Sequence, residues 1–539
     1  MTASATPRKS AAHASASAAS AFRHKAFAII WIATVISNIG TWMYNLASGW
    51  LMLGLNADPF IVSLVQVANS LPMFLFAIPA GALVDIVDRR RFLIVGESGT
   101  TLVSLLFAAL VWQHLVTPTS LLVFSFIVTV GSAITAPAWQ AVVPQLVTRE
   151  DLPSAVAANS AGINVSRAIG PALGGALVNG FGIAAPFWVD ALSNLGVIGA
   201  LIWWRPPPKV SSGLPPESIG GAIRTGIRHA RYNNHLRGTL LRAVAFFIFG
   251  SGYWALLPLV VHSRTGGGAG LYGILLGCIG FSAVCGAFSL PRLRRHWNAD
   301  RLLVGGTLAT SIATGLFAIA QQAWMAVLAS VIAGLAWIVS LSSLNISAQT
   351  SLPDWVRGRG LAVYVTAMFG ALTLGSALWG EVAARMSLPL ALLLCAAGGI
   401  LVIPLTSRWK LQTGAHVDFS PSLHWPAPVV VRHVDADRGP VMVTVEYRID
   451  PANRLPFLKA LGIYGRERRR DGAYDWGVYE DPAQPGRFVE TFRTDSWLEH
   501  LRHHQRVTRA DRVLESEVRR FQLGGDPKTT HLIDARIEE

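Results

Sequence analysis

Arg167 is the residue in this sequence whose position points most directly to chemistry. It lies in Asn164-Val-Ser-Arg-Ala-Ile-Gly-Pro171, near the middle of an apolar segment long enough to cross a membrane. It is the only Lys or Arg of the first 407 residues that we expect outside a connecting loop. A guanidinium at bilayer depth costs at least about 3 kcal/mol on insertion scales, so it should face a cavity or polar partners. We predict that it holds an anionic group of a small-molecule substrate or a carboxylate; the alternative is an Arg that snorkels to the membrane surface or only ties two helices together.

The residues that follow Arg167 predict a hinge in the same helix. Gly170 and Pro171 come three residues later, and Gly174 and Gly175 come one turn after that. Proline removes a backbone hydrogen bond and bends a helix, whereas glycines let a neighbouring helix approach closely. A buried cation beside such a hinge is typical of a transport pathway through a helix bundle.

Other polar side chains within apolar segments are predicted to line the same pathway. Such residues are costly in lipid and are expected to face a wet interior or to bond across helices. Asn38, Trp42 and Asn45 share one helix face by their spacing. The full set of pathway candidates is Asn38, Trp42, Asn45, Gln66, Asn69, Gln140, Asn164, Arg167, Asp190 and Asn345.

Three acidic residues fall within apolar segments, each near a segment end: Glu97, Asp190 and Glu381. A proton-coupled transporter needs a carboxylate that titrates as access alternates. All three are shallow, so each is expected to be a gate or interface residue rather than a midplane proton carrier. Of the three we favour Asp190 as the proton carrier, because its helix follows the helix of Arg167 and could bring the two side chains together.

Twelve apolar segments provide the elements that would position these residues. The composition is 52% hydrophobic and only 14% charged, whereas an ordinary soluble protein has about 25% charged residues. A membrane span needs about 20 residues. Segments of this length are expected at 27–54, 60–84, 92–113, 119–141, 155–180, 184–204, 240–262, 269–291, 302–320, 323–349, 361–384 and 388–407.

The distribution of positive charge predicts the orientation. With the N-terminus in the cytoplasm, the inside loops hold 21 Lys and Arg residues and the outside loops hold two, Arg264 and Arg385. Cytoplasmic loops carry the excess of basic residues in such proteins. We therefore expect a multi-pass protein of the cell (inner) membrane with both termini cytoplasmic. Loop charge also explains the net charge of +14 without a nucleic-acid partner.

The domain plan follows from an internal repeat at a spacing of about 209 residues. Pro144-Gln-Leu-Val-Thr-Arg149 is echoed by Pro353-Asp-Trp-Val-Arg-Gly-Arg359. We expect a disordered tail at 1–22, a six-helix half at 23–204, a cytoplasmic linker at 205–239, a second six-helix half at 240–407, a linker at 408–438 and a cytoplasmic domain at 439–539. The first linker should contain a basic helix at 219–233, either along the anionic leaflet or as a solvated connector.

Three motifs resemble those of the major facilitator superfamily. Gly81-Ala-Leu-Val-Asp85-Ile-Val-Asp88-Arg89-Arg90-Arg91 is similar to its signature loop, and Gly170-Pro-Ala-Leu-Gly-Gly175 to the fifth-helix motif of its antiporters. Ser37-Asn-Ile-Gly-Thr-Trp42 resembles the transmembrane secretion effector branch, which includes the enterobactin exporter. The resemblance implies two six-helix halves around a central substrate. It also implies a cytoplasmic gate formed by Gly81, Asp85, Arg89 and Arg90, where the glycine allows tight packing.

The C-terminal domain reads as a β-α-β-β-α-β unit, typical of a ferredoxin-like fold. Strands are expected at 441–449, 474–480, 487–493 and 529–535, and helices at 455–470 and 496–521. It resembles domains of the antibiotic-biosynthesis-monooxygenase type. His500, His503 and His504 are expected on a charged, solvated helix face with no Cys or acidic ligand cluster at metal spacing, which favours a binding or dimerisation module over catalysis.

The sequence as a whole predicts an all-α membrane protein with an α+β domain, and a secondary active transporter rather than an enzyme. We expect a proton-coupled exporter of a small hydrophobic or siderophore-like molecule, with no cofactor and no metal. The alternative is a bifunctional or regulatory membrane protein whose C-terminal domain senses or modifies the cargo.

Overall fold

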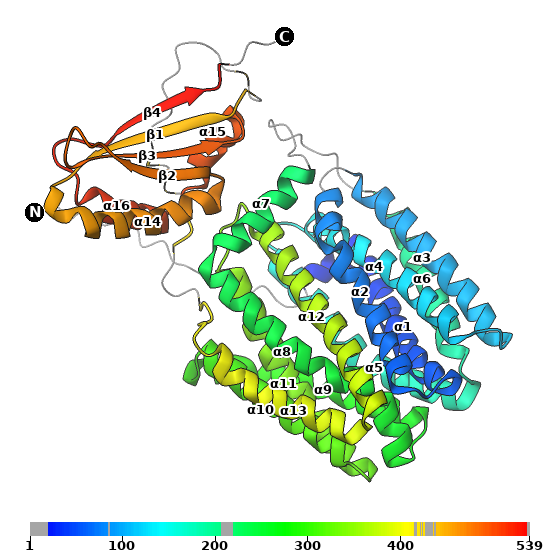
Figure 1. Ribbon diagram of the computed structural model, residues 1–539. Coiled ribbons are helices and arrows are strands. Elements are labelled where there is room, and N and C mark those ends of the chain that lie inside the picture. The colour runs from blue at the N-terminus through cyan, green and yellow to red at the C-terminus, as the bar shows by residue number, and fades with distance from the viewer. Residues whose placement is uncertain are drawn as a thin grey trace, which may run out of the picture.

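In the part of the chain that the structure describes, twelve long helices form a bundle, and a smaller domain with a sheet lies at one end of it (Figure 1). The computed structural model describes residues 20–84, 87–205, 219–413 and 438–535, together with 418–420, 422, 424, 425 and 435. The first half of the bundle contains α1(Lys25–Leu55), α2(Pro59–Val84), α3(Arg89–Trp112), α4(Pro118–Leu146), α5(Leu152–Phe181) and α6(Ala185–Trp203), preceded by the short helix η1(Ser20–Arg23). The second half contains α8(Asn234–Leu259), α9(Ala269–His296), α10(Ala299–Ile319), α11(Ala323–Thr350), α12(Arg357–Arg385) and α13(Leu388–Thr406), and α8 runs into a π-helical turn η2(Val260–Arg264).

Eleven of these helices are long and apolar enough to cross a membrane, among the residues that the structure describes. The remaining long helix is α5, whose length of 30 residues is sufficient. Its Asn, Ser and Gly residues and Arg167 leave it without a continuous stretch as apolar as those in the other eleven. The candidate cation and hinge therefore lie on the long helix that lacks such a stretch.

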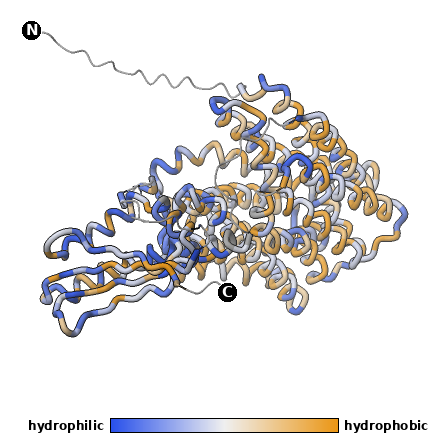
Figure 2. Tube along the Cα trace, turned by 90° about the horizontal axis from the view of Figure 1, so that it is seen from above, coloured by the Kyte–Doolittle hydropathy of each residue, from blue (hydrophilic) through white to orange (hydrophobic). Residues whose placement is uncertain are grey.

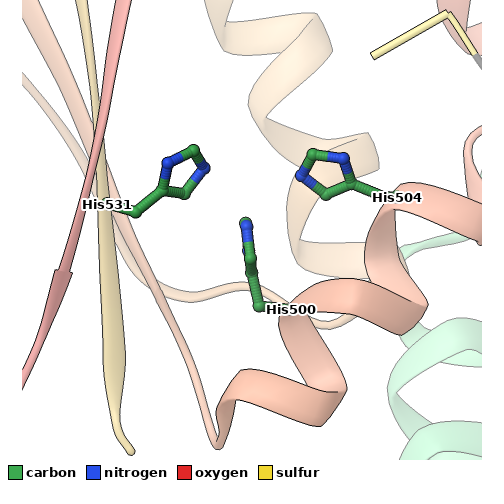
Figure 3. Close-up of side chains that lie close together, drawn as sticks. All are labelled: His500, His504 and His531. Carbon is green, nitrogen blue, oxygen red and sulfur yellow. The ribbon is translucent and has the colours of Figure 1, made fainter. Parts of the chain in front are cut away.

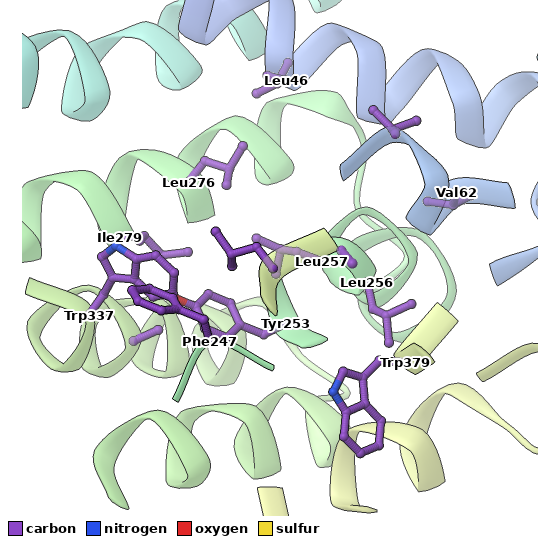
Figure 4. Close-up of a cluster of buried hydrophobic side chains, with 14 of the residues drawn as sticks. Leu46, Val62, Phe247, Tyr253, Leu256, Leu257, Leu276, Ile279, Trp337 and Trp379 are labelled. Carbon is purple, nitrogen blue, oxygen red and sulfur yellow. The ribbon is translucent and has the colours of Figure 1, made fainter. Parts of the chain in front are cut away.

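The core of the bundle is an apolar cluster that reaches across both halves. It includes Leu46 and Val62 of the first half with Phe247, Tyr253 and Trp337 of the second (Figure 4). Hydrophobic residues cover the bundle, whereas hydrophilic residues are concentrated in the C-terminal domain and the helix ends (Figure 2). This distribution is the one expected for a bundle that faces lipid and a domain that faces water.

The linker helix α7(Ile219–Tyr232) packs between the bundle and the C-terminal domain. It contacts α12, α2 and α8 on the bundle side and α14(Arg454–Asp471) on the domain side. The helix at 219–233 is thus present, but His229 is fully buried and lies 5.6 Å from the Trp355 ring. We expected this helix either along the membrane leaflet or as a solvated connector. Packing between the bundle and the C-terminal domain was not among these expectations.

Two further contacts tie the C-terminal domain to α7 and to the bundle. The guanidinium of Arg228 lies 3.9 Å from a carboxylate oxygen of Glu499 in the domain. The guanidinium of Arg506 stacks on Trp355, which precedes α12, at 4.4 Å. The segment after α13 is anchored as well, because the backbone N–H of Gln412 donates to Ser347 Oγ at 2.9 Å.

The C-terminal domain has the predicted β-α-β-β-α-β order. Its strands are β1(Val441–Arg448), β2(Tyr474–Glu480), β3(Arg487–Thr494) and β4(Lys528–Ile533), arranged as β2-β3-β1-β4 with every neighbouring pair antiparallel. The helix α14 lies on one face of the sheet (Figure 1). On β1, Val441, Val443, Val445 and Tyr447 alternate inward and are buried, as expected for a strand with one covered face.

The single helix expected at 496–521 is wrong, because the chain breaks there into two. They are α15(Trp497–Arg506) and α16(Arg509–Arg519). Thr508 is extended and caps α16, and its hydroxyl and the Asp511 side chain form a capping box. Such a box starts a new helix by satisfying two backbone N–H groups.

Candidate functional site

A cavity of about 380 Å³ lies between the two halves of the bundle. Helices α1, α2 and α5 of the first half and α8, α9, α11 and α12 of the second contribute to its wall. Ligand cavities in proteins commonly have about 300–1,000 Å³. The lining residues are Trp42, Asn45, Leu46, Gly49, Val62, Val65, Gln66, Asn69, Arg167, Trp254, Ala255, Pro258, Tyr272, Leu276, Trp337, Leu341, Met368, Phe369 and Leu372.

Of the described residues, Arg167 is the only charged side chain in the wall of this cavity. Its guanidinium carbon lies 5.2 Å from the centre of the Trp42 ring, within the distance at which a cation is attracted to an indole face. Arg167 Nε is buried and has no hydrogen-bond partner among the described residues. Asn69 Oδ1 and Trp254 Nε1 are in the same condition. Unsatisfied buried polar groups are costly, so a ligand or water that pairs with them would be stabilised here.

The structure brings together half of the predicted pathway residues. Trp42, Asn45, Gln66, Asn69 and Arg167 line the cavity. Asn38, Gln140, Asn164, Asp190 and Asn345 are not in its wall. Gln140 is exposed on α4, and the Asn164 amide donates to the Ser160 carbonyl of its own helix at 2.8 Å.

Asp190 lies in a packed interface of the first half and not beside Arg167. It is 2% exposed, and it accepts hydrogen bonds from Ser104 Oγ at 3.3 Å and Thr41 Oγ1 at 3.4 Å. These partners belong to α3 and α1. The expected pairing of Asp190 with Arg167 is therefore absent from the described structure, and no acidic side chain lines the cavity.

The other two acids also lie away from the cavity. Glu97 accepts a hydrogen bond from Trp139 Nε1 at 2.9 Å within the first half. Glu381 pairs with Arg385 at 2.5 Å near the end of α12. Both are placed as structural contacts near helix ends.

Arg167 is not the only basic residue inside a long helix, contrary to expectation. Arg242 lies in α8, is 4% exposed and pairs with Asp300 of α10. It also donates to the Trp409 carbonyl at 3.4 Å. Arg242 is thus a paired cation that joins helix ends, whereas Arg167 faces a cavity.

The glycines after Arg167 form close helix contacts. A Cβ at Gly170 would lie 2.5 Å from Trp42 Cβ, and one at Gly174 would lie 3.1 Å from Met43 Cα. Both contacts are with α1. A Cβ at Gly175 would lie 2.7 Å from the Ala269 carbonyl oxygen of α9. The motif therefore packs α5 against its own half and against the other half at once.

The predicted gate is described only in part. Asp85 lies outside the described residues. Among the described residues, a Cβ at Gly81 would meet nothing within 4 Å, so tight packing at this glycine stays a prediction. Arg90 donates to the carbonyls of Leu201 and Ile202 at 2.8 and 2.6 Å, which ties α3 to the end of α6 in the same half. Arg89 Nε is buried and has no hydrogen-bond partner in the described part of the chain.

The aromatic residues of the second half were missed by reasoning from polar residues. Trp254, Tyr272, Trp337 and Phe369 line the cavity from α8, α9, α11 and α12. Aromatic residues in apolar helices do not stand out in a sequence, because most of them pack against lipid or against the core. Only the fold shows which ones face the cavity.

The histidines of the C-terminal domain are not on a solvated face, so that expectation is also wrong. His500 and His503 are each 2% exposed. Burial, with nearby cationic groups, lowers the pKa of His500 to about 3 and of His504 to about 4. These imidazoles are therefore neutral at pH 7. His500 and His504 lie close to His531 of β4, and the three ring nitrogens concerned are all within 4.8 Å of one another.

Comparison with curated proteins gives several membrane transporters. The chain is 23% identical over 261 residues to the staphyloferrin A transporter of Staphylococcus aureus, covering 48% of this chain and 65% of that protein. It is 24% identical over 391 residues to the enterobactin exporter of Salmonella typhimurium, covering 71% of this chain and 91% of the exporter. It is 26% identical over 375 residues to an uncharacterised MFS-type transporter of Bacillus subtilis, covering 67% and 87%.

Solved structures of transporters share the fold of the bundle. An auto-inhibited peptide transporter of the POT family superposes with a TM-score of 0.59 at 11% identity, covering 73% of this chain and 98% of that one. A bacterial homologue of the lysosomal transporter Spinster, inward-facing and occupied, gives a TM-score of 0.55 at 14% identity, covering 72% and 97%. These similarities concern the fold alone.

The sequence profile of one family extends over nearly the whole chain. The profile described as transmembrane secretion effector matches residues 16–538, which include the C-terminal domain as well as the bundle. The two six-helix halves, the cavity between them and the similarity to transporters agree with this match. The chain belongs to the transmembrane secretion effector family of major facilitator transporters.

Proposed function

We propose that the protein is a secondary active exporter of the inner membrane, which moves a small anionic molecule with aromatic or hydrophobic parts. The observation that carries this proposal is the cavity between the halves, where the Arg167 guanidinium lies over the Trp42 ring and has no carboxylate partner among the described residues, and where Trp254 and Trp337 also line the wall. A cation and several aromatic faces suit a carboxylate or catecholate molecule. Siderophores have such groups, and relatives named for siderophore transport support that cargo class.

The proposed mechanism is alternating access between the two halves. The end of α5 and the start of α9 lie at the end of the bundle remote from the C-terminal domain, and there Gly175 and Gly273 bring the two helices into backbone contact. This contact supports a conformation closed at that end. If both termini are cytoplasmic, as the loop charges predict, the closed end is the outer one, and the proposed conformation is inward-facing. The cargo would then enter from the cytoplasm.

Proton exchange is the proposed driving reaction. Asp190 supports this role, because it is the buried carboxylate at the contact of α1, α3 and α6. Protonation there would change the Thr41 and Ser104 hydrogen bonds, and α1 also carries Trp42 of the cavity. The coupling would thus pass through α1 and need no direct contact between Asp190 and the cargo.

The C-terminal domain is proposed to act as an accessory module. It holds α7 and the start of α12 through Arg228 and Arg506. Dimerisation through this domain remains a prediction. The alternative, in which the domain modifies the cargo, has less support because the family and its relatives are transporters.

A comparison of metabolites inside and outside cells tests the proposal. Cells with the wild-type protein, with the Arg167→Ala variant and without the gene are grown under iron limitation, and cell extracts and media are analysed by mass spectrometry. We expect one anionic compound to accumulate inside the cells that lack a functional protein and to be depleted from their medium. Identical distributions in all three strains, at equal protein levels for the two variants, would reject export.

A further inference from the structure

The C-terminal domain contains a group of three histidines that the proposed transport function does not use. His500 and His504 lie on α15, four residues apart and therefore on the same helix face. His531 lies on β4, where it pairs with Val443 of the neighbouring strand. The three rings point toward one another across the space between the helix and the edge of the sheet (Figure 3).

The distances fit a site that a small rotation of the rings would complete. The ring centres of His500 and His504 are 4.8 Å apart, and those of His500 and His531 are 4.7 Å apart. One nitrogen from each ring lies within 4.8 Å of the other two. In a tetrahedral zinc site with Zn–N bonds of about 2.0–2.1 Å, the ligand nitrogens are about 3.4 Å apart. The nitrogens would therefore need to approach by about 1.4 Å at most, which changes in side-chain torsions alone can supply.

His500 has free ligand atoms in a buried position. It is 2% exposed, and neither of its ring nitrogens has a hydrogen-bond partner in the described part of the structure. A buried imidazole without partners is costly. A bound metal ion would satisfy one of the nitrogens, whereas a core histidine with a purely structural role would normally have a hydrogen-bonded partner.

The charge state and surroundings also suit a metal ion. Burial lowers the pKa of His500, His504 and His531, so all three are neutral at pH 7, and neutral imidazole is the form that binds metals. Arg468 is the arginine whose positive charge acts on His500. Its guanidinium lies 3.4 Å from the Glu490 carboxylate, and this negative charge offsets much of the repulsion between Arg468 and a bound metal ion. His504 and His531 are half-buried, which leaves a route from solvent.

We propose that His500, His504 and His531 form a binding site for a divalent late transition metal ion of the Zn²⁺ class. Imidazole ligands suit zinc, copper, nickel and iron(II), whereas calcium and magnesium prefer oxygen. Three protein ligands leave a fourth coordination position for water or another small ligand. The proposal goes beyond the transport function, because it concerns only the C-terminal domain.

The test is Zn²⁺ binding to the purified full-length protein. The protein carries an affinity tag without histidines and is freed of metal with a chelator. Equilibrium dialysis against ZnCl₂ in detergent, with metal measured by atomic emission, gives the stoichiometry and the affinity. His504→Gln and His531→Gln remove one ligand each at half-buried positions, so they disturb the fold less than a change at His500. His296→Gln is the matched control, because His296 is exposed and far along the chain at the end of α9.

The wild type and His296→Gln should each bind one Zn²⁺ per chain with the same affinity. His504→Gln and His531→Gln should each weaken binding by at least about 100-fold, since even outer-shell changes cost about 10- to 100-fold in metal sites. Thermal unfolding of metal-free samples shows whether each variant is folded, and Zn²⁺ should raise the unfolding temperature of the wild type and the control alone. Absence of one tight site in the wild type, or binding by folded His504→Gln and His531→Gln equal to the control, overturns the proposal.

Discussion

The cation in the cavity allows a quantitative prediction for transport. Arg167 Nε has no hydrogen-bond partner among the described residues, and its guanidinium faces a cavity of about 380 Å³. If it binds an anionic group of the cargo, Arg167→Ala removes a hydrogen bond to a charged group, which is worth about 1.5–3 kcal/mol. At about 1.4 kcal/mol per factor of ten, the KM for export should rise about 10- to 150-fold. Arg167→Lys keeps the charge but loses the planar fork, so the rise should be smaller, about tenfold or less.

The assay must separate transport from folding. Export is measured in cells as initial rate against internal cargo concentration, and folded protein is measured in the same membranes by size-exclusion chromatography of a fluorescent fusion. Asn164→Ala is the matched control, because Asn164 is on the same helix but bonds to Ser160 and does not line the cavity. Its KM should stay within about twofold of the wild-type value, which corresponds to less than about 0.5 kcal/mol.

The reasoning fails if Arg167→Ala reduces only the amount of folded protein. In that case Arg167 would join α5 to α1 through Trp42, and transport per folded molecule would equal that of the wild type. A KM change of the same size in Asn164→Ala would also contradict it, because the effect would then come from α5 as a whole.

Four further predictions follow from the same structure. Gly175→Leu should abolish most transport, because its Cβ would lie 2.7 Å from the Ala269 carbonyl. Gly180→Leu should transport normally, because a Cβ there meets no described atom within 4 Å. Equal transport rates per folded molecule in the two variants would refute the role of the contact between α5 and α9 in closing the cavity. Asp190→Asn should fold but export at a rate that no longer responds to a proton gradient, as measured in everted vesicles, and an intact response would remove Asp190 from the coupling. Burial raises the pKa of Glu515, but hydrogen bonds from Trp425 and His424 outweigh it and lower the pKa from 4.5 to about 2. The Glu515 carboxylate should therefore stabilise the C-terminal domain above about pH 4.5 by about 3 kcal/mol, and this stabilisation should be lost as pH falls toward 2. Glu515→Gln should lower the unfolding temperature at pH 7 but not near pH 2, and an equal loss at both pH values would contradict this. A cysteine at Thr119 should react with an impermeant reagent in intact cells and one at Ser212 should not, whereas labelling at position 212 would reverse the orientation.

The fold could be predicted well because its signals are long and repeated. Apolar stretches of membrane length predict spanning helices from composition alone, and the echo of Pro144–Arg149 in Pro353–Arg359 indicates a duplicated half. Alternation in β1 and the turn before β3 predict the antiparallel sheet. The break at Thr508 was missed because both flanking segments are good helix formers, although Thr508 and Asp511 have the spacing of a capping box.

The candidate site could be predicted only from its polar side. Arg167, Trp42 and Asn45 stand out as unusual residues in apolar segments, and they line the cavity. Asp190 stands out equally in the sequence, but its side chain lies in a packed interface. A single polar residue near one end of a helix does not show which face of that helix points toward the cavity. The aromatic wall and the group of His500, His504 and His531 depend on elements far apart in the sequence. The spacing of His500 and His504 is typical of two metal ligands on one helix face. The third ligand, His531, comes from β4 and could not be assigned without the order of the strands.

Transport by the purified protein is the most direct test of the central claim. The compound identified from the metabolite comparison is supplied outside liposomes that contain the protein with its cytoplasmic face outward, and an acidic interior provides the proton gradient. We predict that the compound accumulates inside, that collapse of the gradient stops accumulation, and that Arg167→Ala requires much higher concentrations for the same rate. Accumulation no faster than in protein-free liposomes, or an equal rate in Arg167→Ala at low concentration, would contradict an exporter that binds its cargo in the cavity between the halves.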